Sequence, residues 1–352
     1  MILEEISFLN VRKLEQFSQK LSPNTTIITG KNGQGKTSIL EAIFFLLTAK
    51  SFRKKYNKSI IKDQEERLEI KGKIIKEATT TLRIAYNGKK KQIKKNEKQI
   101  KKTSELLSFS NIVSASPEEI DVIEAHRGER IKYFDKISFK ISTKFVETIN
   151  KYNKLLKIRN TLLETNQPTK PWDKQVAETG IKVWLEREKT LNKIIEQFIK
   201  KEKEITKKNT YEINYQQNKT EKIEQYIYEL SKKNTQQKTN FGPHKDKVVF
   251  KLKNTQLQET GSQGEKKLFK YILKLTEAEI LRRENNTKPI ILLDDFFAKL
   301  DDENIMKIFT FFHRKFQTII TTTTIKDTAM EKTINSCQQN TIKIIELNDK
   351  TI

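Results

Sequence analysis

Cysteine is almost absent from this 352-residue chain, in which Cys337 is the single example. One thiol excludes an intramolecular disulfide and any zinc site built on paired cysteines, and it suits a reducing cytosol. Histidine is also scarce, because only His126, His244 and His313 are present and they lie far apart in the sequence. This scatter, with no extra cluster of carboxylates, argues against a nuclease.

Long apolar runs are missing as well. No segment approaches the ~20 consecutive apolar residues that a membrane-spanning helix needs. The first residues, MILEE, lack the basic, apolar and small-residue regions of a signal peptide. We therefore expect a cytoplasmic protein. Hydrophobic residues still make up 35% of the chain, enough for the core of two domains or of one large lobed domain.

Acidic residues are outnumbered by basic ones, 45 against 69, which gives a formal net charge of +24. Such a charge favours a polyanionic partner, because neutralising phosphates releases counterions and drives nucleic-acid binding that does not depend on sequence. The alternative is compositional bias, because Lys, Asn and Ile are abundant throughout, as an AT-rich coding sequence would produce. A functional basic surface is the interpretation that we favour.

Glycines are few but three of them fall in one segment that matches G-x-x-x-x-G-K-[ST], the phosphate-binding loop. A short β-branched strand at 25–29 precedes it and an apolar helix at 38–48 follows, which is the order that this loop requires. The alternative is a glycine-rich turn with an incidental lysine. The residues assigned to nucleotide binding are Gly30, Lys31, Asn32, Gly33, Gln34, Gly35, Lys36, Thr37 and Ser38. Lys36 would also act in catalysis by reaching the β/γ-phosphates, and Thr37 would ligate Mg²⁺.

A second motif is the apolar run 289–293 followed by two carboxylates, a Walker B pattern. We expect Asp294 to hold Mg²⁺ and Asp295 to be the general base that polarises the attacking water. Residues 296–301 then resemble a D-loop. A further core strand is expected at 317–323, with its end near the γ-phosphate and threonine where ABC-type enzymes often have histidine.

The third motif opens a helix that we expect to run to Glu279. Ser262, Gln263 and Gly264 resemble the ABC-type signature, in which a serine hydroxyl and a backbone N–H at a helix N-terminus face a γ-phosphate. Alone this signal is weak, because Ser and Gly are ordinary caps. The three motifs in order predict an ABC-type ATPase core that uses ATP and Mg²⁺. Each motif occurs once, so two copies are needed, as an ATP-dependent homodimer with ATP buried head to tail between them.

The predicted fold class is α/β, an ABC-type P-loop ATPase domain with a mixed sheet, helices and an antiparallel β subdomain, and with an inserted helical lobe. We assign residues 1–116 and 241–352 to the ATPase head and 117–240 to the lobe. Alternation at 68–100 around the turn Asn87-Gly88 predicts a β-hairpin, whose lysine-rich second strand we expect at an exposed edge. Residues 201–240 are polar, and we expect them to form a loose return path. The helices have too few heptads for long coiled-coil arms.

The sequence resembles the RecF family over nearly its whole length. The segments that carry the resemblance are 6–12, 30–43, 152–160, 172–173, 242–246, 262–264 and 293–301. The resemblance implies a weak, DNA-stimulated ATPase that dimerises on ATP, binds double-stranded and gapped DNA at single-strand/double-strand junctions, and helps to load RecA with RecO and RecR. The chain departs from the family pattern at Glu265-Lys266-Lys267, where Gln-Gln-Arg is usual, and at 242–247, where a second acid is usual.

Two other functions fit part of the sequence. A transporter's nucleotide-binding subunit would have the same ATPase motifs, but it predicts an apolar docking surface for membrane helices and no affinity for DNA. A scaffold with a vestigial ATP site is the other alternative, and the presence of both Asp294 and Asp295 argues against it.

Overall fold

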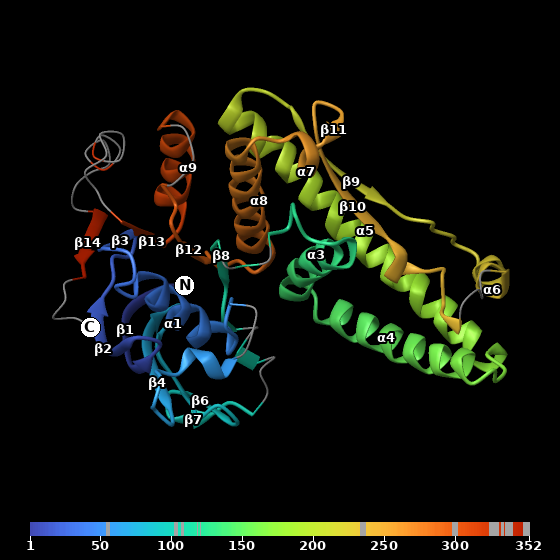
Figure 1. Ribbon diagram of the computed structural model, residues 1–352, viewed down its shortest axis with the longest axis horizontal. Helices are drawn as coiled ribbons and strands as arrows, with labels where there is room; N and C mark the ends of the chain where they lie inside the picture. Colours follow the sequence, from blue (N-terminus) through green and yellow to red (C-terminus); the bar gives the residue numbers. More distant parts are fainter. Residues whose placement is uncertain are drawn as a thin grey trace. The chain divides into compact units, whose positions relative to one another are not determined.

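The computed structural model describes residues 1–53, 57–101, 105–106, 109–117, 119, 121–232, 237–297, 302–323, 331, 334 and 341–347 (Figure 1). Contacts divide the chain into two compact units, Met1–Asp121 with Gln263–Ile352, and Val122–Ser262. Two features singled out in the sequence fall outside the described residues: Cys337 and the last four residues of the expected D-loop, 298–301.

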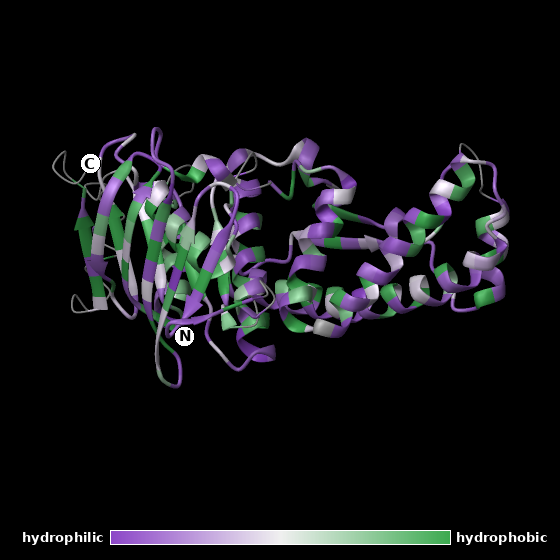
Figure 2. Ribbon diagram, turned by 90° about the horizontal axis from the view of Figure 1, so that it is seen from below, coloured by the Kyte–Doolittle hydropathy of each residue, from purple (hydrophilic) through white to green (hydrophobic). Residues whose placement is uncertain are grey.

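The first unit contains a six-stranded antiparallel sheet in the order β2-β1-β4-β5-β6-β7. Its strands are β1 (Ile2–Val11), β2 (Leu14–Lys20), β4 (Leu68–Ile75), β5 (Thr79–Tyr86), β6 (Lys91–Lys95) and β7 (Lys98–Gln99). Hydrophobic and hydrophilic residues alternate along them, as the green and purple bands in Figure 2 show. This period of two buries one face of the sheet.

The predicted hairpin is present, since β5 and β6 pair antiparallel around Asn87-Gly88. The expectation of an exposed lysine edge on its second strand is wrong, because β7 pairs with β6 and takes the edge position. Lys91 is half-buried, and its Nζ donates a hydrogen bond of 2.6 Å to the carbonyl oxygen of Ala49. The long methylene stem of lysine allows this, because it covers apolar surface while the ammonium group finds an acceptor.

A five-stranded parallel sheet carries the nucleotide motifs, in the order β14-β3-β13-β12-β8. Its strands are β3 (Thr25–Thr29), β8 (Ile112–Ala115), β12 (Ile290–Leu293), β13 (Thr318–Thr322) and β14 (Ile342–Glu346). Four of them are buried on both faces, as short continuous apolar or β-branched runs predict. Helix α1 (Lys36–Thr48) contacts strands of both sheets, and their side chains form one hydrophobic core.

Two further helices belong to this unit, α8 (Gln263–Glu284) and α9 (Asp302–Lys315). They contact each other and run side by side in Figure 1. A short 3₁₀ turn, η1 (Asn57–Ile60), follows the segment after α1.

The second unit consists of helices and a small antiparallel sheet. Its helices are α3 (Arg127–Ile141), α4 (Thr143–Glu164), α5 (Lys170–Thr206), α6 (Ile223–Lys232) and α7 (Leu257–Thr260), with the 3₁₀ turn η3 (Pro243–Lys245). The sheet has the order β11-β10-β9, from Thr255–Gln256, Lys247–Leu252 and Tyr211–Gln216. Helices α4 and α5 pack along each other around Trp184 and Tyr152.

The expected loose path at 201–240 is wrong for its middle part, where β9 and α6 form. Tyr211 and Ile213 alternate with polar residues and are buried where β9 pairs with β10. Tyr226 and Leu230, four residues apart on α6, are buried in the core of this unit. High Lys, Asn and Gln content concealed these short apolar patterns.

Within the described parts of the chain, no helix combines the length and hydrophobicity that a membrane crossing requires.

Candidate functional site

The phosphate-binding loop connects β3 to α1 in the geometry that its glycines allow. Gly33 and Gly35 have φ angles of 86° and 89°, in the left-handed region that favours glycine. Gly35 is also the N-cap of α1, so the first N–H groups of that helix point out of its N-terminus toward the loop. A Cβ atom at Gly35 would come within 2.9 Å of Leu14, which packs against the loop. Chain conformation and packing together require glycine here.

Lys36 folds back over this loop. Its Nζ donates hydrogen bonds to the carbonyl oxygens of Gly30 at 2.5 Å and Lys31 at 2.8 Å. Partial burial lowers the pKa of Lys36, while the nearby charges of Asp295 and Asp294 act in the opposite direction. The ammonium group therefore lies near the two carboxylates, and the two carbonyl oxygens accept its hydrogen bonds.

The buried side chain of Gln34 forms a hydrogen bond with the backbone of its own loop. Its Oε1 accepts a 2.6 Å hydrogen bond from the backbone nitrogen of Lys31, and its side chain is buried. Lys31, Asn32 and Gly33 are exposed at the tip of the loop, while Ser38 is buried in the first turn of α1. The backbone of the tip is thus open to a ligand.

Asp294 lies at the end of β12 and is buried with three hydroxyl groups around it. Its Oδ1 accepts hydrogen bonds from Thr37 at 3.0 Å and Thr321 at 2.6 Å, and its Oδ2 accepts one from Ser116 at 2.9 Å. These residues come from α1, β13 and the end of β8. The parallel strands therefore bring the Walker B carboxylate to the start of the phosphate-loop helix.

Asp295 has a different environment from its neighbour. Its side chain is exposed, and its backbone has a φ angle of 50°, which is uncommon for a residue other than glycine. Its N–H donates to the Thr321 hydroxyl at 3.0 Å, and its carbonyl oxygen accepts from Lys267 of α8 at 3.2 Å. Two contacts thus hold the backbone of a residue whose carboxylate faces solvent.

The donor set suits Mg²⁺. A hydroxyl oxygen of Thr37 and a carboxylate oxygen of Asp294 lie 3.0 Å apart, and hard divalent cations prefer oxygen ligands of these kinds. Within the described residues, no group of three or more His, Cys, Asp or Glu side chains could hold a metal by itself. A metal at Thr37 and Asp294 would need further oxygens from nucleotide phosphates or water.

From the sequence we did not identify Ser116 as a site residue, and we assigned no specific contact to Thr321. Ser116 directly follows the four-residue buried strand β8, which is the parallel neighbour of β12. A polar residue at that position, at the same sheet edge as Asp294, is the signal that could have identified it. Thr321 belongs to the strand whose end we expected near the γ-phosphate.

The signature residues lie at the start of α8. Ser262 precedes the helix and is exposed, and Gln263 and Gly264 are its first two residues. Lys267, one turn later, is the residue that contacts Asp295. The first turn of α8 is therefore close to the Walker B end of the sheet.

Known proteins resemble this chain over most of its length. The family model described as "RecF/RecN/SMC N terminal domain" matches residues 2–115. The DNA replication and repair protein RecF of Alkaliphilus oremlandii is 31% identical over 349 residues, which is 93% of this chain and 95% of that protein. RecF of Clostridium botulinum strain Langeland is 32% identical over 346 residues, 93% and 94% of the two chains.

Solved structures also resemble this chain over most of its length. A structure of the recombination mediator protein RecF with ATP, in the RecFOR pathway, has a TM-score of 0.81 and 29% identity, with 93% of each chain covered. The Smc head domain of Pyrococcus furiosus has a TM-score of 0.54 at 16% identity and covers 94% of this chain and 91% of its own, which shows a shared fold. These likenesses confirm the predicted ABC-type ATPase fold class.

Proposed function

Because this chain belongs to the RecF family, we propose that it is an ATPase of DNA replication and recombinational repair that binds double-stranded and gapped DNA. The observation that supports this most directly is the meeting of the phosphate loop with the buried Asp294. Its relatives over 93% of the chain are DNA replication and repair proteins, which argues against the transporter alternative.

The roles of the chain's residues follow from their positions. Backbone N–H groups of the loop 30–38 would bind phosphate oxygens, and Lys36 would exchange its carbonyl acceptors for the β/γ-phosphates. Thr37 and Asp294 would hold Mg²⁺, which neutralises phosphate charge when it is bound. Asp295, exposed on a fixed backbone, would orient the attacking water and accept its proton.

A second copy of the chain would complete the site. Ser262 is exposed where it precedes α8, and we propose that its hydroxyl contacts the phosphates of a nucleotide held by the partner. ATP would close the dimer on DNA, and hydrolysis would release it. The net charge of +24 supports a phosphate-rich partner.

The preferred DNA structure, the partner proteins and the cellular location are proposed from membership of the RecF family. We propose a preference for single-strand/double-strand junctions, and cooperation with RecO and RecR in loading RecA, in the cytoplasm. A relative's structure is described as belonging to the RecFOR pathway, which supports these partners.

Fluorescence anisotropy of a labelled gapped duplex, at two salt concentrations and with or without Mg-ATP, tests the proposal. We expect tighter binding with ATP, and loss of that increase in Lys36→Ala, which removes the charge that binds the phosphates. If DNA affinity is the same with and without Mg-ATP and is lost at the higher salt concentration, positive charge alone would explain the binding. That result would contradict an ATP-driven DNA clamp.

A further inference from the structure

The turn between β5 and β6, in the first unit, is held by its own polar groups. The side chain of Asn87 accepts hydrogen bonds from the backbone nitrogens of Lys89 at 3.2 Å and Lys90 at 2.8 Å, a contact by which asparagine commonly stabilises a turn. Gly88 supplies the left-handed conformation, with a φ angle of 80°. Its carbonyl oxygen accepts a 2.9 Å hydrogen bond from the hydroxyl group of Tyr86. The backbone that carries the two lysines is therefore fixed.

The strand after this turn contacts the end of α1. Lys91, the first residue of β6, donates its 2.6 Å hydrogen bond to the carbonyl oxygen of Ala49, the C-cap of that helix, where a positive charge is favoured. The same Nζ lies over the rings of Phe45 and Tyr86, 5.2 and 5.4 Å from their centroids. Lys50 follows Ala49 in the chain, so it lies close to the start of β6. Burial, and then the charge of Lys50, lower the pKa of Lys91.

A further segment brings another lysine to the turn. The side chain of Lys58 packs against Gly88, since a Cβ atom there would lie 3.1, 3.3 and 3.4 Å from the Cγ, Cδ and Cε atoms of the lysine. Lys58 belongs to η1, which is anchored in the core of the unit. Ile60 of η1 is fully buried, and its carbonyl oxygen accepts a 2.9 Å hydrogen bond from the backbone nitrogen of Arg12. Contacts between three distant segments therefore form one lysine-rich surface.

The exposed lysines of this surface, here called the hairpin lysines, are Lys50, Lys58, Lys89 and Lys90. Among the residues that the structure describes, none of them forms an ion pair. Glu41 of α1 contacts the segment after Lys50, but it is fully buried and already paired with Arg12 at 2.8 Å and Arg53 at 3.3 Å. Like charges held near one another repel, and an anion that binds among them offsets this repulsion.

We propose that the hairpin lysines bind the phosphate backbone of duplex DNA. This inference rests on the proposed DNA-binding function and assigns part of it to the first unit. Exposed cations on a fixed backbone suit an extended polyanion, because little main-chain freedom is lost when the phosphates bind. Such contacts position a protein on DNA without reading its bases.

The test is a salt titration of DNA affinity. The full chain is titrated against a labelled duplex with Mg-ATP, and the slope of log affinity against log salt concentration is measured. Since each phosphate contact contributes about 0.9 to the magnitude of that slope, we expect the variant K50Q/K58Q/K89Q/K90Q to lower it by about three to four. Its DNA binding at low salt should be weaker, and its ATP affinity should be unchanged.

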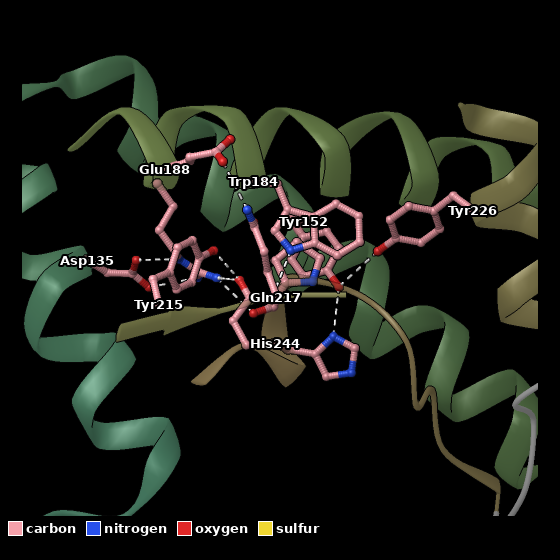
Figure 3. A network of polar contacts seen from close by, with 11 residues as sticks. Asp135, Tyr152, Trp184, Glu188, Tyr215, Gln217, Tyr226 and His244 are labelled. Carbon is pink, nitrogen blue, oxygen red and sulfur yellow. Dashed lines mark hydrogen bonds and ion pairs between the residues drawn. The ribbon is translucent and has the colours of Figure 1, made fainter. Parts of the chain in front are cut away.

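A control variant loses the same number of charges from lysines that have acidic partners. K62Q/K73Q/K200Q/K219Q removes the lysines that pair with Glu15, Glu4, Glu196 and Glu188. Glu188 also accepts a hydrogen bond of 3.1 Å from Gln217 (Figure 3), so its carboxylate keeps a partner when Lys219 is replaced. Because net charge changes equally in the two variants, we expect the control to keep the slope of the unaltered chain.

A second variant, K50R/K58R/K89R/K90R, keeps the charge of the hairpin lysines and should also keep the slope. A lower slope in this arginine variant would contradict the proposal, because charge would then not be what the surface supplies. If the two glutamine variants have equal slopes and affinities while the unaltered chain binds DNA, the assignment of this surface is wrong and the proposed function stands. If the unaltered chain binds no DNA, the proposed function fails and the surface with it.

Discussion

The hydroxyl group of Thr321 donates a hydrogen bond of 2.6 Å to Oδ1 of Asp294. The same hydroxyl oxygen accepts the backbone N–H of Asp295 at 3.0 Å. One side chain on β13 therefore fixes the carboxylate of the first aspartate and the backbone of the second. Because the two aspartates have separate roles in the proposed function, a change at Thr321 affects both.

Replacing Thr321 with valine keeps the shape of the side chain and removes this hydroxyl. A hydrogen bond to a charged group contributes about 1.5–3 kcal/mol, so we expect ATP turnover to fall by about 10-fold to 100-fold. Nucleotide binding should change less, because the phosphate loop is untouched. Steady-state ATPase assays and nucleotide titrations measure the two effects.

Thr318→Val is the matched control for this change. Thr318 is also buried on β13, but its hydroxyl donates to the carbonyl oxygen of Phe316 at the other end of the strand. Thr318→Val should lower the free energy of unfolding without a comparable loss of ATP turnover. Equal turnover in Thr321→Val and the unaltered chain would contradict the positioning role.

Ser116→Ala tests the hydroxyl that sequence reasoning missed. Without the 2.9 Å hydrogen bond to Oδ2, Asp294 is less firmly oriented toward Thr37. We expect the Mg²⁺ concentration for half-maximal ATP binding to rise several-fold, with metal-free nucleotide affinity unchanged. Ser114→Ala, at a buried serine within β8 itself, should leave this Mg²⁺ dependence as it was. An unchanged Mg²⁺ dependence in Ser116→Ala would show that Asp294 does not need this contact.

The nucleotide motifs were predictable from the sequence because their spacing is local. The loop 30–38 and the carboxylates after β12 each lie within a dozen residues, and the strand-loop-helix order of the first was correct. Their meeting followed from the parallel order of strands that end at one sheet edge.

What the sequence did not reveal depends on pairing between distant segments. The hydrogen bond from Ser116 to Asp294 joins residues 178 positions apart, and no local pattern encodes it. The strand at 211–216 was missed because its partner, β10, is separated from it by an intervening helix and turn. The burial of Lys91 likewise depends on an acceptor, the carbonyl oxygen of Ala49, in a different part of the chain.

Gly35→Ala tests the geometry of the phosphate loop. Alanine there must adopt a φ angle near 89° and place its Cβ 2.9 Å from Leu14. A strained position of this kind costs of order 1–3 kcal/mol, so we expect lower thermal stability and weaker ATP binding. Gly128→Ala, in the first turn of α3 with no atom within 4 Å of its new Cβ, should be neutral or stabilising. Full ATP affinity in Gly35→Ala would mean that the loop tolerates a different conformation.

Ser262→Ala separates nucleotide binding from dimer closure. The residue precedes α8 and is exposed, so its loss should leave ATP binding to a single chain intact. Because its hydroxyl is proposed to contact the partner's nucleotide, the ATP-dependent dimer should not form. Analytical ultracentrifugation with Mg-ATP measures this, and Lys36→Ala is the comparison that loses both binding and dimer. A full ATP dimer in Ser262→Ala would disprove the signature role.

Stability of the second unit should depend on pH through His244. Burial is the main cause that lowers the pKa of His244 from its ordinary 6.5 to about 4. In the unfolded chain the imidazole takes up a proton as the pH falls through 6.5, whereas in the folded chain it does so only near pH 4. The unfolded state therefore binds more protons between these values, and folding stability falls as the pH is lowered across that window.

Over the whole window this amounts to about 3 kcal/mol, since one pKa unit corresponds to about 1.4 kcal/mol. Denaturant unfolding at pH 7 and pH 4.5, followed by tryptophan fluorescence, measures it, because Trp172 and Trp184 both lie in this unit. Burial also raises the pKa of Asp135 and of Asp246, but these groups are common to the unaltered chain and His244→Gln. We therefore compare the two proteins: the unaltered chain should lose more stability on acidification than His244→Gln. Equal losses would mean that His244 is not held neutral by its buried position.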